Sequence, residues 1–454
     1  MLTDLANGDF PLSFWPRVRE FAVPPSMIET ATARRRAGDW AGACAAANVD
    51  VDVRPRLVAR RYGREAAARL RADLRHLAPD LLRWHMPRIA PDGLLRPGLT
   101  ITLSRYGTTG PGALHLVART PPAWADAGQR ISLALWDASR AREAHRHHPH
   151  PRPSRRFRLD LHRHLWDARR AGELRARSGE GGAGPDPAGP APYGQRCAVD
   201  RWAAEAEILL RAGGRSGGRV SVRLGARHRV VLEVSDGGEQ AAMSYARAPD
   251  ASLPVLPDAA TWVLPDLELL RAGAIDAGRL HPLVASALGA ERTGTPGVPE
   301  RAGDPRVPER AGDPRVVECR GARHRIGLVD GALAALDHDP AEIRREELLA
   351  AFGGPPLPCL RAVDDAHRRP ECLPGVRERL HHGDTAGALA AVESLLGPEA
   401  VLRDGPLRDA LETAARRRIA HGLYRAGLDG PPPGSLRPWD RRRSRDDGPH
   451  PRHM

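Results

Sequence analysis

Two patterns in the sequence have spacings that occur in catalytic sites. The segment Gly214–Gly218 fits G-x-S-x-G, the spacing of a nucleophile elbow with Ser216 at its centre. An elbow needs a strand before the serine and a helix after it, whereas this sequence predicts the reverse order. The glycines of Gly179–Gly184 satisfy G-x-G-x-x-G, but Pro185 follows directly and no strand–helix unit surrounds them. We interpret the first pattern as a turn and the second as a linker, and we assign no catalytic or cofactor-binding residue and no cofactor.

Histidines and cysteines supply the candidate metal ligands, although neither CxxC nor HExxH occurs. We interpret the histidine run as a solvated loop, with weak binding of a transition metal as the alternative. We interpret the histidine pair as the polar face of a strand and the cysteines as buried structural residues, so the sequence assigns no metal site. The three sets are His145, His147, His148 and His150; His162 and His164; and Cys359, His367 and Cys372 with His381 or His382.

All 69 basic residues of the 454-residue chain are arginines. A standard P-loop, a protein kinase site and a pyridoxal phosphate site each need a lysine at a defined position, so none of these can be present in standard form. The sequence therefore favours a protein that is not an enzyme. An enzyme built on less familiar residues stays open.

Arginine interleaved with aromatic residues is the pattern through which a protein contacts phosphates and stacks on bases. The alternative is that Trp136, Phe157 and Trp166 are core residues. The net charge of +13 also suits a polyanion, but the arginine content is typical of proteins from very GC-rich, actinobacterial-type genomes and explains part of it. The candidate nucleic-acid residues are Arg155, Arg156, Arg158, Arg163 and Trp166.

The cellular location is predicted from three features. The first 20 residues lack a cationic start and a cleavage site of small residues, and no uncharged apolar run reaches the roughly 20 residues of a membrane helix. The five cysteines are odd in number and scattered, unlike a disulfide framework. We expect a soluble, cytoplasmic protein without a membrane partner.

The N-terminal part predicts helices followed by an antiparallel meander. Residues 26–48 read as a helical hairpin, with Gly38 and Asp39 as the stop and start signals between its helices, and a longer helix follows from Pro55. Alternating apolar residues then predict four strands, with a loop or insertion at 138–153 before the last of them. The predicted strands are Leu99–Leu103, Leu114–Leu116, Ile131–Leu135 and Phe157–Leu161.

Two further hairpins are predicted beyond a Gly/Pro linker. The pentapeptide GARHR occurs at Gly225–Arg229 and again at Gly321–Arg325, each time within a predicted hairpin. Duplication of one hairpin and coincidence in an arginine-rich chain are both open. Between them, VPERAGDPR at Val298–Arg306 is copied at Val307–Arg315, which we interpret as a linker that grew by duplication.

The C-terminal part is predicted to be helical. Gly383–Ala388 repeats the GDxAGA pattern of Gly38–Ala43, and both resemble the turn of a tetratricopeptide-like helical hairpin. The 34-residue period does not follow, so the resemblance implies helical hairpins and no repeat array. The arginine-rich tail after residue 430 is predicted to be disordered.

These patterns predict a multi-domain α+β protein. Its predicted parts are a helix-plus-antiparallel-sheet domain (1–178), a linker (179–197), a small α+β domain (198–290), a tandem-repeat linker (291–315), a hairpin followed by a helical domain (316–429) and a disordered tail (430–454). The expected function is that of a non-enzymatic protein-interaction or adaptor protein with an unidentified protein partner. The alternative is an arginine-mediated nucleic-acid-associated protein.

Overall fold

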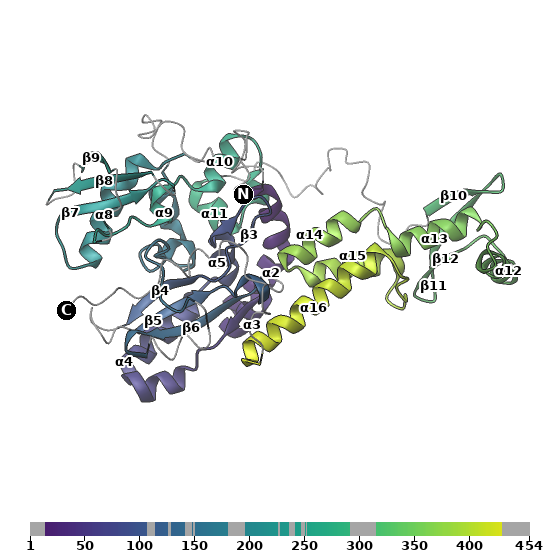
Figure 1. Cartoon of the computed structure of the whole chain (residues 1–454), viewed down its shortest axis with the longest axis horizontal. Helices are drawn as coiled ribbons and strands as arrows, with labels where there is room; N and C mark the ends of the chain where they lie inside the picture. The colour runs from purple at the N-terminus through teal and green to yellow at the C-terminus, as the bar shows by residue number, and fades with distance from the viewer. Residues whose placement is uncertain are drawn as a thin grey trace, which may run out of the picture. The chain divides into compact units, whose positions relative to one another are not determined.

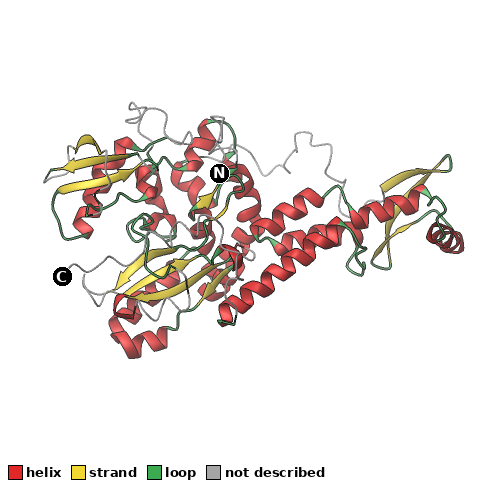
Figure 2. Cartoon of the chain, viewed as in Figure 1, coloured by secondary structure: helices red, strands yellow, loops and turns green. Residues whose placement is uncertain are grey.

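The chain divides into two compact units, Met1–Arg292 with Ala420–Met454, and Thr293–Ile419 (Figure 1). Helices and small antiparallel sheets make up both, which confirms the predicted multi-domain α+β class (Figure 2). None of the described helices is long and apolar enough to cross a membrane. The computed structural model describes residues 14–106, 114–125, 129–140, 148, 150–179, 196–225, 228–235, 241–246, 250, 252–290 and 315–428.

The first unit is built on a four-stranded sheet with the strand order β1-β6-β5-β4. Strands β4 (Thr100–Tyr106), β5 (Leu114–Arg119) and β6 (Ile131–Asp137) form the predicted antiparallel meander. The fourth strand is β1 (Val49–Val51), which follows the helical hairpin and pairs with β6 in parallel.

The prediction of a fourth strand at Phe157–Leu161 is wrong. This segment forms turns, in which the backbone N–H of Leu161 donates to the carbonyl oxygen of Arg158 over 3.2 Å. Its one ladder contact is an isolated bridge between Arg158 and Thr102. Phe157 and Leu159 are nevertheless buried, so the alternation of apolar residues reflects packing of an irregular segment and not a strand.

The predicted helical hairpin is present as α2 (Pro25–Arg36) and α3 (Trp40–Ala46). The Asp39 carboxylate caps α3 by accepting a hydrogen bond of 2.8 Å from the backbone N–H of Gly42. Helix α4 (Pro55–His76) follows as predicted, and α5 (Pro79–His85) begins with a proline. The unit opens with α1 (Trp15–Arg17) and the π-helix η1 (Val18–Ala22).

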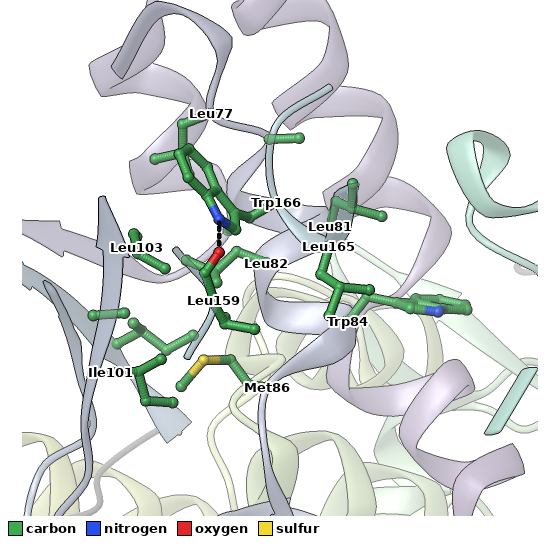
Figure 3. Close-up of a cluster of buried hydrophobic side chains, with 14 of the residues drawn as sticks. Leu77, Leu81, Leu82, Trp84, Met86, Ile101, Leu103, Leu159, Leu165 and Trp166 are labelled. Carbon is green, nitrogen blue, oxygen red and sulfur yellow. Dashed lines mark hydrogen bonds between the residues drawn. The ribbon is translucent and has the colours of Figure 1, made fainter. Parts of the chain in front are cut away.

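One hydrophobic core joins these helices to the sheet (Figure 3). Trp166 is fully buried in it, and its indole Nε1 donates to the carbonyl oxygen of Leu159 over 3.0 Å. The same core includes buried apolar residues between Val263 and Leu288. The remaining elements are β2 (Arg88–Ile89), β3 (Leu94–Leu95), η2 (Ala123–Ala125), η4 (Ala138–Arg140), η5 (Arg163–Leu165), η6 (Ala171–Glu173), α7 (Leu174–Arg177), α10 (Pro265–Arg271), η7 (Ala277–Arg279) and α11 (Pro282–Leu288).

A second core lies in the same unit. Helix α8 (Val199–Ala212) packs on the antiparallel sheet of β7 (Gly218–Arg223), β8 (Arg229–Val234) and β9 (Ala241–Ala246), and α9 (Asp258–Thr261) closes it. The predicted hairpin is therefore confirmed and has a third strand. Ser216 lies exposed in the turn between α8 and β7.

The second unit begins with another three-stranded antiparallel sheet of β10 (Arg315–Cys319), β11 (Ala322–Val329) and β12 (Ala332–Ala335). The described residues of both GARHR copies lie between the first two strands of a three-stranded meander or at the start of the second strand, and residues 226–227 of the first copy lie outside the described residues. Whether the two hairpins are duplicates stays a prediction. The helices that follow are α12 (Pro340–Ala351), α13 (Pro358–Arg368), α14 (Leu373–His382), α15 (Thr385–Leu396) and α16 (Pro406–Ala426), whose residues from Ala420 onward belong to the first unit.

Helices α14 and α15 form the second predicted hairpin, with the same turn as the first. Asp384 accepts a hydrogen bond of 2.9 Å from the backbone N–H of Gly387, as Asp39 does from Gly42. Gly383 before it adopts a left-handed conformation with φ of 89°, which a glycine tolerates without strain. The first copy of VPERAGDPR and most of the second lie outside the described residues.

Candidate anion-binding cavity

The first unit contains a cavity of about 430 Å³ between its two hydrophobic cores. Part of its wall is apolar and includes Trp84, Met86, Leu159 and Leu165, which Figure 3 labels within the cluster of buried hydrophobic side chains. The rest is unusually basic, because the described lining residues include one carboxylic acid, Asp258, and seven arginines. The arginines are Arg19, Arg88, Arg96, Arg156, Arg158, Arg177 and Arg223.

Arg19 is held between two aromatic rings at one end of the cavity. Its guanidinium carbon lies 4.7 Å from the ring centroid of Trp15 and 4.1 Å from that of Trp84. Its Nη2 pairs with Asp266 at 2.8 Å, and its Nη1 donates to the Trp84 carbonyl oxygen at the same distance. Burial lowers the pKa of Arg19 in spite of the Asp266 carboxylate. Arg19 is thus a buried cation held by a carboxylate, a carbonyl oxygen and two aromatic rings, although its Nε, like that of Arg88, has no hydrogen-bond partner among the described residues.

Arg88 has a different environment. It donates to the carbonyl oxygens of Gly93 at 3.2 Å and Arg83 at 2.9 Å, and its Nε has no hydrogen-bond partner among the described residues. Burial, followed by the positive charges of Arg83 and Arg19, lowers the pKa of the Arg88 guanidinium well below its usual value. Three cations lie close together here, and the carboxylate of Asp266 pairs with Arg19 and not with Arg88. An anion in the cavity would relieve this repulsion.

The opposite wall carries an ion pair between Arg156 and Asp258, and two more arginines act on the same carboxylate. Arg156 Nε lies 2.5 Å from Asp258 Oδ1, and Arg223 and Arg96 act on the same carboxylate. Burial raises the pKa of Asp258, although all three arginines oppose that shift. One half-buried carboxylate therefore interacts with three guanidinium groups.

Two more arginines of the lining pair with carboxylates that are not themselves part of the lining. Arg158 pairs with Asp160 at 2.7 Å, and Arg177 pairs with Glu205 at 2.7 Å. Arg177 also donates to the carbonyl oxygen of Leu161 at 2.7 Å. Because carboxylates hold one edge of each guanidinium, these side chains are positioned before any ligand arrives.

Two neutral histidines complete the polar lining. Burial lowers the pKa of His85 to about 4, and burial followed by the charges of His162 and Arg177 lowers the pKa of His164 well below its usual value. The Nε2 of His85 and the Nδ1 of His164 are buried and have no hydrogen-bond partner among the described residues. Each can donate or accept one hydrogen bond to a ligand, depending on its tautomer.

The candidate nucleic-acid residues separate into three environments. Arg156 and Arg158 line the cavity, while the neighbouring Arg155 is exposed and does not. Arg163 lies over the ring of Trp166 at 4.5 Å and pairs with two carboxylates of the core, those of Asp73 and Asp167. Arg163 and Trp166 thus support the fold, and Trp136 is likewise not part of the cavity.

The predicted histidine and cysteine sets are not brought together as sets. His145 and His147 lie outside the described residues, whereas His148 is buried and its Nε2 lies 3.0 Å from the Thr120 carbonyl oxygen. His162 and His164, interpreted as an exposed polar face, are both buried, and His162 lies 3.2 Å from Glu205. Cys359 lies beside Cys319, a residue of another sequence region.

Sequence reasoning missed most of the cavity, including Arg19, Arg88, Arg177 and Asp258. Nothing in the local sequence separates these residues from the many other arginines and acids. The cavity lining spans residues 14–265, and only the packing of distant segments brings it together. Comparisons of the chain with protein-family models, curated proteins and solved structures found no match.

Proposed function

We propose that the first unit binds a phosphorylated ligand of nucleotide size in this cavity, either a free nucleotide or the terminal nucleotide of a single strand. The observation that carries the proposal is Arg88, a half-buried guanidinium whose Nε has no hydrogen-bond partner among the described residues and on which the positive charges of Arg83 and Arg19 act. This arrangement costs stability unless an anion occupies the cavity. The proposal deepens the arginine-mediated nucleic-acid function expected as an alternative from the sequence.

The chemistry of the lining supports a phosphate on an aromatic ligand. Arginine presents paired N–H donors that match phosphate oxygens, and the guanidinium is always available as a cation in water. Phe157 and Trp262 contribute aromatic surface to the same wall as Arg156. Such rings stack on a nucleobase and contribute about 1–3 kcal/mol per base.

The size of the cavity supports a small ligand or a strand end. Its volume of about 430 Å³ lies in the range of roughly 300–1,000 Å³ of small-molecule sites. A duplex needs an extended convex or grooved basic surface, and arginines that line a cavity do not provide one. The cytoplasmic location stays part of the proposal and is supported by the five cysteines, which are all free.

Equilibrium binding with the full chain tests this function. Inorganic phosphate, mononucleotides and short single-stranded oligonucleotides with and without a terminal phosphate are titrated at low and moderate salt. We expect saturable binding to one site that weakens with salt and is lost in Arg88→Met and Arg156→Gln. Arg155→Gln is the matched control, because it is adjacent in sequence and outside the cavity. Absence of binding to every probe, or equal binding by all variants, refutes the proposal.

The adaptor function remains a second candidate, and helix α12 is the observation that favours it. None of its residues is buried, and Leu348, Leu349 and Phe352 are exposed, Phe352 at 90%. An exposed apolar set of this kind is typical of a surface that binds another protein. We expect Leu348→Glu with Phe352→Glu to abolish association with a protein partner or a second copy of the chain in sedimentation experiments. Unchanged association would exclude α12 as the interface.

A further inference from the structure

Three potential metal ligands from distant parts of the sequence converge in the second unit. Cys319 ends β10, His338 lies just before α12, and Cys359 lies in the first turn of α13. One donor atom of each lies within 4.8 Å of the others. This is the one group of at least three such ligands found among the described residues.

The three side chains are buried, and one ring nitrogen of His338 is available to bind a metal. Cys319 and Cys359 are fully buried, and the His338 side chain is 4% exposed. The Nδ1 of His338 lies 3.4 Å from an oxygen of Glu342, while its Nε2 is buried without a hydrogen-bond partner among the described residues. A carboxylate on one ring nitrogen is the usual support of a metal-bound histidine, because it orients the ring and leaves the other nitrogen to the metal.

Another histidine lies next to this group, outside the set of donor atoms within 4.8 Å of one another. The His324 ring on β11 stacks on the His338 ring, with the centroids 4.2 Å apart and an angle of 12° between the planes. The Nδ1 of His324 is buried and also lacks a hydrogen-bond partner among the described residues. Two imidazoles that each have a buried, unsatisfied nitrogen beside two buried thiols make an unfavourable arrangement, which a bound cation would satisfy.

Few buried apolar residues surround these ligands. The hydrophobic cluster here contains three buried residues, Cys319, Leu357 and Cys359, and α12 contributes no buried residue. A small sheet with so little apolar burial normally depends on a disulfide or a structural metal. The two cysteines lie at the centre of this cluster, where a metal would have the largest stabilising effect.

We propose that Cys319, His338 and Cys359 bind one Zn²⁺ ion, with His324 as the fourth ligand. Two thiolates and two imidazoles match the preferences of Zn²⁺, whereas Mg²⁺ and Ca²⁺ prefer oxygen ligands. Four protein ligands leave no open position, so the site is structural. The proposal concerns the second unit and does not depend on the ligand of the first.

The metal content of the full chain is the direct test. We expect one equivalent of zinc in the purified protein by mass spectrometry of metals, and its replacement by Co²⁺ to give the visible bands of a tetrahedral thiolate site. Cys359→Ser should lose the metal, and Cys372→Ser is the matched control, because Cys372 is a half-buried cysteine of the same unit outside the cluster. Zinc retained by Cys359→Ser, or a disulfide between Cys319 and Cys359 in the purified protein, would overturn the proposal.

A second measurement keeps the test decisive if Cys359→Ser does not fold. In the wild-type chain, a zinc chelator should reduce hydrogen-exchange protection of residues 315–368 and leave that of the first unit unchanged, and added Zn²⁺ should restore it. Protection that does not respond to the chelator while zinc is removed would overturn a structural role. His324→Ala should weaken Zn²⁺ binding at least about tenfold, and unchanged affinity would overturn the four-ligand site.

Discussion

Arg19 and Asp266 form a buried ion pair of 2.8 Å across 247 residues of sequence. Both side chains are almost inaccessible to solvent. The pair connects η1 (Val18–Ala22) to α10 (Pro265–Arg271) within the first unit. The indole N–H of Trp84 donates a further hydrogen bond of 3.1 Å to the same carboxylate. It therefore closes the first unit around one end of the cavity.

Replacement of Asp266 by alanine should destabilise the first unit strongly. The change leaves the Arg19 charge buried without a carboxylate, which costs about 3–5 kcal/mol of unfolding free energy. Urea denaturation followed by tryptophan fluorescence measures this loss, because Trp15 and Trp84 contact Arg19. The double variant Arg19→Met with Asp266→Leu should lose less than Asp266→Ala alone. A double variant as unstable as the single one would show that the pair is not the cause.

Replacement of Arg88 by methionine should affect stability and binding in opposite directions. Removal of a half-buried cation that is repelled by Arg83 and Arg19 should raise the unfolding free energy of the ligand-free protein by about 1 kcal/mol. The same change should weaken anion binding at least about tenfold, the effect of about 1.4 kcal/mol. Thermal unfolding and phosphate titration measure the two effects, with Arg155→Gln unchanged in both. A destabilised variant with normal affinity would contradict our account of this residue.

The stability of the first unit should depend on pH through Glu205. Burial alone would raise its pKa, but hydrogen bonds from His162 and Arg177 outweigh burial and bring the pKa to about 2, below the usual 4.5. Its contribution is therefore fully present above about pH 4.5 and is lost as the pH falls toward 2. A shift of this size corresponds to about 3 kcal/mol at most.

Glu205→Gln should accordingly be less stable than the wild type at pH 7, and the difference should shrink between pH 4.5 and 2. Chemical denaturation at several pH values measures it. Glu207→Gln on the same helix is the control, because its partner Arg211 is largely exposed and such pairs contribute little. A constant difference between Glu205→Gln and the wild type over this pH range would contradict the prediction.

Two glycines of the second unit should respond to alanine with opposite signs. At Gly387 an added Cβ would clash with Oδ2 of Asp384, the carboxylate whose Oδ1 caps α15, so the substitution should displace this carboxylate and cost about 1 kcal/mol through loss of the cap. At Gly375, within α14, a Cβ meets no atom within 4 Å. Gly375→Ala should therefore stabilise the helix by up to about 1 kcal/mol. Thermal unfolding compares the two, and equal effects would contradict this explanation.

Local features of the fold could be predicted from the sequence. The GDxAGA turns at Gly38–Ala43 and Gly383–Ala388 form as expected, because an aspartate that caps a helix needs only the backbone N–H three residues later. The meander of β4, β5 and β6 likewise follows from alternating apolar residues. The wrong prediction of a strand at Phe157–Leu161 has the same origin. A pattern of alternating apolar residues indicates which side chains are buried, and an irregular segment can also bury alternate residues.

The sequence by itself determined the α+β class, the helical hairpins and the absence of lysine, which excludes the standard lysine-dependent sites. Only the tertiary structure decided that β1 and not Phe157–Leu161 completes the sheet, and that Arg88 and Asp258 face one cavity. It also decided that Cys319, His338 and Cys359 meet. Hydrogen bonds of caps and turns act over a few residues and leave a signal in the sequence. Sites assembled across hundreds of residues depend on how hydrophobic cores pack, and no local pattern encodes that packing.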